Sequence, residues 1–313
     1  MGIWYLKKSI LKTVLIYLEK LIPFYLSVKL RDKKLTERCL DTYDRYLDPK
    51  EVAILIQGPL VLKDEFTYQT LKLYHHIYPS VLILYSTWSN QDQNQMDKIK
   101  KLGVKVIINE KPLFAGTQNI NLQIKSTAEA LDYLCKETDV KYVLKTRSDQ
   151  RISRRINFLG LFRSLLASYP ISINDNIRER LIISGLNSFQ IRLYGISDML
   201  MFGNIHDMLA YWQITQQSEE VVLIESNPKY FIKNNIAEGY LVNSFFKTVD
   251  YEPKWTQEDS DSFIKKYFLI IEKEQIDLFW FKYERWFDNY VFCEENFMER
   301  KELNFSDWIN IKE

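Results

Sequence analysis

The chain has 313 residues, which is enough for one large domain or two modest ones. Hydrophobic residues make up 46% and charged residues 27%, an ordinary globular balance, and the net charge of +1 argues against a nucleic-acid-binding protein. The three cysteines lie far apart without a C-x-x-C pair, so we expect no disulfide framework and a cytoplasmic location. The three histidines form no H-E-x-x-H motif, which argues against a zinc site.

The first 34 residues are more basic than the rest, with eight lysines and arginines against two acidic residues. Apolar residues recur every three or four positions between residues 3 and 22, which predicts a helix with one apolar face. Its longest uncharged run, Thr13–Leu18, is far shorter than the roughly 20 residues of a membrane-spanning helix. Two interpretations stay open: residues 1–34 bind an anionic membrane surface, or the helix packs its apolar face on the protein's own core.

From residue 51 the pattern changes to alternating strands and helices. We expect strands at 52–59, 81–87, 104–109 and 141–149, and helices at 64–79, 93–103 and 119–137. Short links between them predict βαβ units, and therefore an α/β fold with a mostly parallel, Rossmann-type sheet flanked by helices. Such sheets bind ligands at the carboxyl ends of their strands. No glycine-rich dinucleotide motif and no P-loop motif occurs in the sequence.

Charged residues alternate at the end of the fourth predicted strand, in "KYVLKTRSD". Lys145, Arg147 and Asp149 share one face of a regular strand. The two cations suit a pyrophosphate, and the carboxylate suits Mg²⁺ or Mn²⁺. The alternative is a local ion pair between Asp149 and one of the cations, and the spacing alone favours it.

Two carboxylates in the second half of the chain are candidates for a general base. Asp198 lies between apolar residues, where an unpaired acid is expected to have a raised pKa. Its alternative role is to cap the following turn. Glu238 lies in the first turn of a helix predicted over 234–247, where the helix dipole already favours an acid without any catalytic role.

The C-terminal part is rich in aromatic residues, with eight in the fourteen positions from 279 to 292. They form either a core stripe that covers the sheet or a wall on which a sugar or lipid-linked acceptor lies. We therefore divide the chain into a helical N-terminal extension (1–50), an α/β domain (51–250) and an aromatic-rich helical C-terminal part (251–313) packed on that domain.

Five segments together resemble the WavE lipopolysaccharide-synthesis family over roughly residues 50–300. They are "VAILIQGPL", "LKLYHHIYPSVLILYSTW", "NINLQIKSTAEAL", "KYVLKTRSDQRI" and "YGISDMLMFGNIHDML". The resemblance implies a GT-A-type bacterial glycosyltransferase. Such an enzyme moves a sugar from a nucleotide-diphosphate donor to an oligosaccharide or lipid-linked glycan of lipopolysaccharide or capsule, as a peripheral protein on the inner face of the cell membrane.

The resemblance also implies roles for individual residues. Asp149 falls where GT-A enzymes carry the last acid of their D-x-D metal motif, so Mg²⁺ or Mn²⁺ is expected there. Arg147 replaces the first acid, however, and is expected to take over part of the cation's work on the diphosphate. Gln57 and Gly58 match the position that holds the nucleoside. Asn119 opens a helix whose N–H groups could meet phosphate, or it only caps that helix.

The resemblance makes Glu238 a candidate for the base beside Asp198, because GT-A enzymes often place their base at such a helix start. Two other functions stay open at this point. One is a polyol-phosphate or nucleotidyl transferase of the same pathway, whose sequence demands are similar. The other is a non-catalytic assembly protein, which would bind no donor.

Overall fold

The computed structural model describes residues 13–21, 33, 48–153, 157–171, 176–190, 192–218, 232, 236–284 and 302–311. The chain divides into two compact units, Met1–Asp32 and Lys33–Glu313. In the first unit residues 13–19 are helical, and their apolar side chains, such as Tyr17, are largely exposed. The rest of the predicted N-terminal helix and most of the 1–50 extension lie outside the described residues. No helix in the described ranges is long and apolar enough to cross a membrane.

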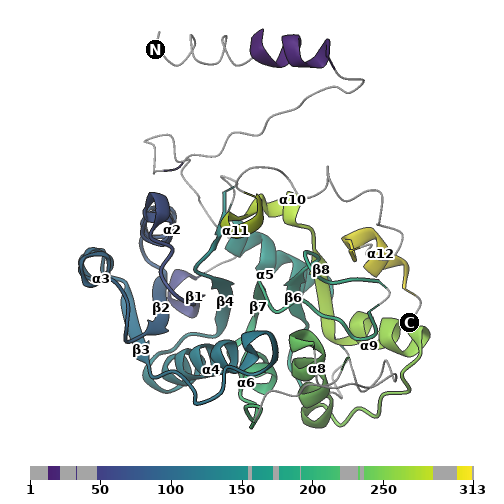
Figure 1. Cartoon of the computed structure of the whole chain (residues 1–313). Coiled ribbons are helices and arrows are strands. Elements are labelled where there is room, and N and C mark those ends of the chain that lie inside the picture. Colours follow the sequence, from purple (N-terminus) through teal and green to yellow (C-terminus); the bar gives the residue numbers. More distant parts are fainter. Residues whose placement is uncertain are drawn as a thin grey trace. The chain divides into compact units, whose positions relative to one another are not determined.

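A seven-stranded sheet forms the centre of the second unit (Figure 1). Its order is β3-β2-β1-β4-β7-β6-β8, and only β7 runs antiparallel to its neighbours β4 and β6. The strands are β1 (Val52–Gln57), β2 (Leu82–Trp88), β3 (Lys105–Asn109), β4 (Tyr142–Arg147), β6 (Leu181–Ser184), β7 (Met201–Asn204) and β8 (Phe268–Ile271). The predicted α/β fold with a mostly parallel sheet is confirmed.

The central strands are buried on both faces because their sequences are continuous apolar runs. Every residue of β1 is buried, although the strand ends in the polar Gln57. Gln57 pairs with Ser86 of β2 on one side and with Arg147 of β4 on the other. The carboxyl ends of three parallel strands therefore meet at one edge of the sheet, as the sequence predicts.

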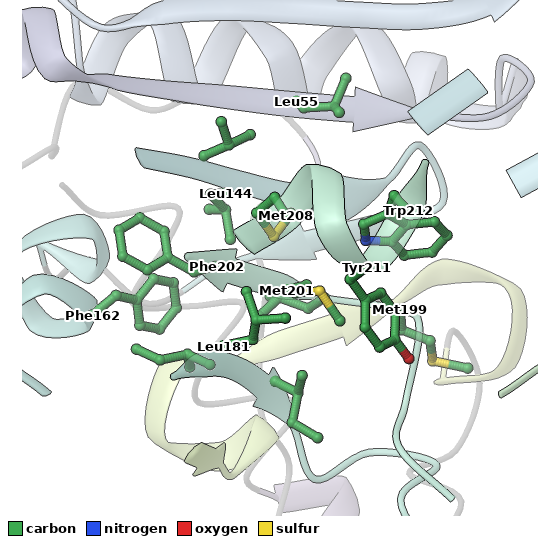
Figure 2. Packing of buried hydrophobic residues seen from close by; sticks show 14 of the residues in the cluster. Leu55, Leu144, Phe162, Leu181, Met199, Met201, Phe202, Met208, Tyr211 and Trp212 are labelled. Carbon is green, nitrogen blue, oxygen red and sulfur yellow. The ribbon is translucent and has the colours of Figure 1, made fainter. Parts of the chain in front are cut away.

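Helices cover both faces of the sheet. They are α2 (Phe66–Ile77), α3 (Gln93–Lys101), α4 (Ile120–Glu137), α5 (Phe158–Ser168), α6 (Ile205–Trp212) and α8 (Ala237–Thr248). Neighbouring residues of a strand face opposite sides. Phe202 packs on Phe162 of α5, whereas Lys145 lies against Trp212 of α6. Figure 2 shows Phe202 beside Phe162, and the α6 side chains Met208, Tyr211 and Trp212 in the core. In Figure 1, α4, α6 and α8 lie side by side.

The C-terminal part contributes strands as well as helices, which corrects the expectation of a purely helical segment. After α9 (Gln257–Tyr267), the apolar run Phe268–Ile271 forms β8 at the edge of the main sheet, parallel to β6. The short strand β9 (Leu278–Trp280) pairs antiparallel with β5 (Gln150–Ile152), directly after the charged end of β4. The described residues of this part also form three short helices, α10 (Lys273–Ile276), α11 (Phe281–Glu284) and α12 (Phe305–Asn310). Most of the aromatic run after Tyr283 lies outside the described residues.

Candidate functional site

A cleft of about 890 Å³ opens at the carboxyl ends of β1 and β4. It lies where an open α/β sheet is expected to hold its ligand. Segments that are far apart in sequence line it: the ends of these two strands, the start of α4, the loop before β7, the start of α8 and the end of β9. Seven of the eight predicted site residues are among its lining: Gln57, Gly58, Asn119, Arg147, Asp149, Asp198 and Glu238.

The eighth predicted residue, Lys145, is not part of the cleft lining, which corrects the expectation that it meets a phosphate. It is fully buried, its Nζ donates to the backbone carbonyl of Asp198, and it lies 4.3 Å from the ring centroid of Trp212. Lys145 lies two residues before Arg147 on the same face of β4, where α6 and the Asp198 loop cover the strand. Burial lowers the pKa of Lys145 to about 7. Lys145 thus holds the backbone of Asp198, a residue that lines the cleft.

Arg147 and Asp149 form a bidentate ion pair inside the cleft. Arg147 Nε lies 2.9 Å from Asp149 Oδ1 and Nη2 lies 3.2 Å from Oδ2, while Trp280 Nε1 donates to Oδ2 over 3.0 Å. Burial by itself would raise the pKa of Asp149, but the charge of Arg147 and these hydrogen bonds hold it below its ordinary value. The local ion pair is therefore present, and it faces the cleft.

The arrangement around Asp149 does not fit a divalent cation. Both carboxylate oxygens already accept hydrogen bonds, and each of them accepts one from the positively charged guanidinium of Arg147. Mg²⁺ and Mn²⁺ need carboxylate oxygens that can coordinate them, and the adjacent positive charge opposes their binding. In the described part of the chain, no three His, Cys, Asp or Glu side chains are grouped so that they could hold a metal ion. The structure thus gives no support to Asp149 as a metal ligand.

The backbone of the predicted nucleoside site is tightly packed. Gly58 has φ of +120°, and a Cβ added there would lie only 2.7 Å from Ser148 Oγ. Ser148 Oγ in turn donates to the carbonyl of Pro59 over 2.6 Å. Gln57 accepts a 3.0 Å hydrogen bond from Ser126 Oγ at its Oε1 and is almost fully buried. A glycine is needed here because the chain turns sharply against the end of β4.

The turn before α4 brings two strained residues to the cleft. Gln118 and Asn119 have φ of 52° and 64°, a conformation that is costly for residues other than glycine. Asn119 makes no side-chain capping bond, so simple capping does not explain it. Gln118 Oε1 instead accepts from the backbone N–H of Ala237 over 2.9 Å. This bond ties the turn to the first residue of α8, next to Glu238.

Glu238 is a buried carboxylate held by two partners. Its Oε1 accepts a hydrogen bond from Asn187 Nδ2 and lies 3.4 Å from Arg192 Nη1. Burial raises the pKa of Glu238 to about 7, the charge of Asp198 adds to the rise, and Arg192 opposes it. An acid with this pKa exchanges its proton readily near neutral pH.

Asp198 faces the same cleft with its side chain only 4% exposed. Within the described part of the chain, no residue donates a hydrogen bond to its carboxylate, and its backbone carbonyl holds Lys145. Its alternative role as a turn cap is not what the structure shows, because Ser197 Oγ accepts the bond from the Met199 N–H over 3.4 Å. Two carboxylates with different surroundings therefore share this end of the cleft.

Three functional-looking residues have no counterpart among the predicted ones. Asn187 and Arg192 lie in "GLNSFQIR", where the composition indicates only a turn. Trp280 belongs to the aromatic run, but the pairing of β9 with β5, which brings it to Asp149, has no local signal in the sequence.

Known proteins give the following likenesses. Among curated proteins, none matches the sequence significantly. A solved glycosyltransferase involved in glycosylation of the major capsid of PBCV-1 is 14% identical, with 53% of this chain and 68% of that chain covered and a TM-score of 0.30. Glucosyl-3-phosphoglycerate synthase from Mycobacterium tuberculosis, solved with Mn²⁺ and UDP-glucose, is 10% identical over 66% of this chain and 82% of that chain, with a TM-score of 0.31. Mouse xyloside xylosyltransferase 1 is 9% identical over 71% and 85%, also with a TM-score of 0.31.

The family profile described as WavE lipopolysaccharide synthesis matches residues 52–280. This match spans all the strands of the main sheet and every residue that lines the cleft except Phe281 and Lys282. The chain belongs to the WavE lipopolysaccharide synthesis family.

Proposed function

We propose that the chain is a glycosyltransferase that moves a sugar from a nucleotide-diphosphate donor to a glycan of the bacterial surface. The observation that carries the proposal is a single cleft with a fixed guanidinium, Arg147, near one wall and two buried carboxylates, Asp198 and Glu238, near another. Sugar transfer needs both kinds of group, a cation for the departing diphosphate and a base for the attacking hydroxyl. Membership of a lipopolysaccharide synthesis family supports a sugar as the transferred group.

On the donor side, Arg147 would neutralise the diphosphate as it leaves. Gln57 and Gly58 lie at the end of β1 and would hold the nucleoside, with the close packing of Gly58 on Ser148 fixing the shape of this subsite. Asn119 would contribute through the backbone N–H groups at the start of α4.

On the acceptor side, we assign the base to Glu238. Its pKa of about 7 suits a group that must be ionised before the reaction and must accept a proton during it. The acceptor hydroxyl would give its proton to the carboxylate while its oxygen bonds to the anomeric carbon. The bond from that carbon to the diphosphate breaks as the new bond forms, and its electron pair leaves with the diphosphate. Asp198 would orient the acceptor, because its carboxylate lies in the same cleft.

The acceptor would be an oligosaccharide or lipid-linked glycan of lipopolysaccharide or capsule. A lipid-linked acceptor would be met at the inner face of the cell membrane. The basic residues of segment 1–34 and the exposed apolar side chains of its described helix, among them Tyr17 and Leu18, support a peripheral contact with an anionic membrane. Sedimentation of the full chain with anionic and with zwitterionic vesicles would test this contact.

The function is tested by titrating the full chain with UDP-, GDP-, CMP- and dTDP-sugars in a calorimeter and by following donor turnover. We expect one donor class to bind, and we expect Glu238→Gln to keep its affinity while turnover falls about 100-fold or more. Glu129→Gln, at an exposed position of α4, is the matched control and should leave both unchanged. A protein that binds none of the donors would be an assembly factor, and transfer of a nucleotidyl group would identify the related transferase class.

A further inference from the structure

The wall of the cleft near β4 contains a cation whose orientation is fixed on two sides. Asp149 grips the guanidinium of Arg147 through two parallel hydrogen bonds of 2.9 and 3.2 Å. Such a bidentate pair fixes the plane of the guanidinium as well as its position. Both side chains line the cleft, and Arg147 is 25% exposed and Asp149 14% exposed.

The C-terminal strand β9 completes this cluster. Trp280 Nε1 donates to Asp149 Oδ2, and its ring centroid lies 5.8 Å from the Cζ atom of Arg147. The backbone is locked at the same place, because Phe281 N–H donates to the Asp149 carbonyl over 2.9 Å. Asp149 thus accepts hydrogen bonds from both sides and stays ionised, since these donors hold its pKa below the ordinary value. A carboxylate in this setting orients an arginine.

The same contacts oppose a metal ion. Asp149 Oδ2 already accepts from both Arg147 Nη2 and Trp280 Nε1, and Oδ1 accepts from Arg147 Nε. A Mg²⁺ or Mn²⁺ ion on Asp149 would therefore lie beside the guanidinium, which would face a doubly charged ion at close range. A metal at this wall would therefore break the arrangement that places Arg147. The positive charge that a metal would bring to a diphosphate is already present on Arg147, and the lining contains two further cationic residues, Arg192 and the exposed Lys282.

We propose that the chain binds the diphosphate of its donor without a divalent cation. Arg147 meets the phosphate oxygens, and Asp149 is a positioning residue that holds Arg147 together with Trp280. This inference rests on the proposed function, because it concerns the nucleoside-diphosphate part of the same donor. It differs from a metal-dependent site in one respect that can be measured, the effect of removing divalent ions on binding.

The experiment is a calorimetric titration of the full chain with UDP, GDP, dTDP, CDP and ADP. Each nucleotide is tested in EDTA and again with Mn²⁺ at a saturating concentration. For the nucleotide that binds, we expect the two Kd values to agree within about threefold. Arg147→Lys keeps the positive charge but cannot form the bidentate hydrogen bonds of a guanidinium, so we expect Kd to rise about tenfold or more in both buffers. Asp149→Asn should weaken binding in both buffers alike, because it releases Arg147.

Arg163→Lys is the matched control for the arginine variant. Arg163 has a similar exposure of 22%, and its Nη1 also faces a carboxylate, Glu179, at 3.5 Å, but it does not line the cleft. This variant should bind the nucleotide like the unmodified chain. Far-UV circular dichroism and the melting temperature of each variant separate a local loss of affinity from a loss of fold.

The outcomes separate the two proposals. If the nucleotide binds only with Mn²⁺, and Asp149→Asn no longer responds to Mn²⁺, the metal-free site is refuted. The glycosyltransferase proposal would then remain intact. If no nucleotide binds in either buffer, both proposals are refuted. Titrating the chain with Mn²⁺ alone gives a further readout by electron paramagnetic resonance, and a stoichiometric site lost in Asp149→Asn would again overturn the inference.

Discussion

Lys145 offers a quantitative test of the structure through the pH dependence of stability. Burial lowers its pKa from 10.5 to about 7, so the unfolded chain holds a proton that the folded chain gives up between these values. The free energy of unfolding should therefore rise with pH across this window. A full difference of one bound proton changes the free energy of unfolding by about 1.36 kcal/mol per pH unit. Because Lys145 in the folded chain is half-protonated at pH 7, the free energy of unfolding should increase by about 3 kcal/mol between pH 7 and about pH 9.5.

Replacing Lys145 with methionine should remove this rise, because no proton is then exchanged at this position. The assay is urea unfolding followed by tryptophan fluorescence at the two pH values. Lys247→Met, at an exposed position of α8, is the control and should keep the pH dependence of the unmodified chain. If the unmodified chain and Lys145→Met change in stability by the same amount, Lys145 is solvated in the folded state and the burial described here is wrong.

Two further predictions concern the base and the glycine at the end of β1. If Glu238 acts as an anion with a pKa of about 7, kcat/KM should decrease as the pH is lowered below 7. Arg192→Met removes a cation that lowers this pKa, so the decrease should begin at a higher pH in this variant. A pH profile that is the same in both proteins would exclude Glu238 as the base. Gly58→Ala should lower the melting temperature by several degrees more than Gly103→Ala. Both glycines have a positive φ, but only a Cβ at position 58 would clash with Ser148. Equal decreases in melting temperature would show that the close packing is absent.

The sequence was informative wherever a local pattern decides the structure. Continuous apolar runs such as residues 52–56 indicated the parallel strands, because a strand that is buried on both faces is apolar at successive positions. Residues at strand ends and helix starts were placed correctly in the cleft, since parallel strands bring their carboxyl ends to one edge. The Gly-Pro step after Gln57 marked the turn whose left-handed glycine the structure shows.

Sequence reasoning failed where contacts between distant segments decide the outcome. Strand alternation placed Lys145 on the same face as Arg147, but only the cover from α6 and from the loop around Asp198 buries it. The run Phe268–Ile271 is too short for its periodicity to separate a strand from a helix, and it became β8 through pairing with β6. Asn187 reached Glu238 only because the turn before β7 packs on the start of α8.

The pairing of β9 with β5 has a consequence for how the protein matures. It joins Asp149 to Trp280, two residues that are 131 positions apart, whereas β1 pairs with β2 over a much shorter stretch of chain. Bringing such remote segments together is slow, because the intervening chain must first be ordered. During synthesis on the ribosome, the core strands can assemble before the tryptophan has been made. A nascent chain would then have its core strands paired well before it could bind a nucleotide-sugar donor.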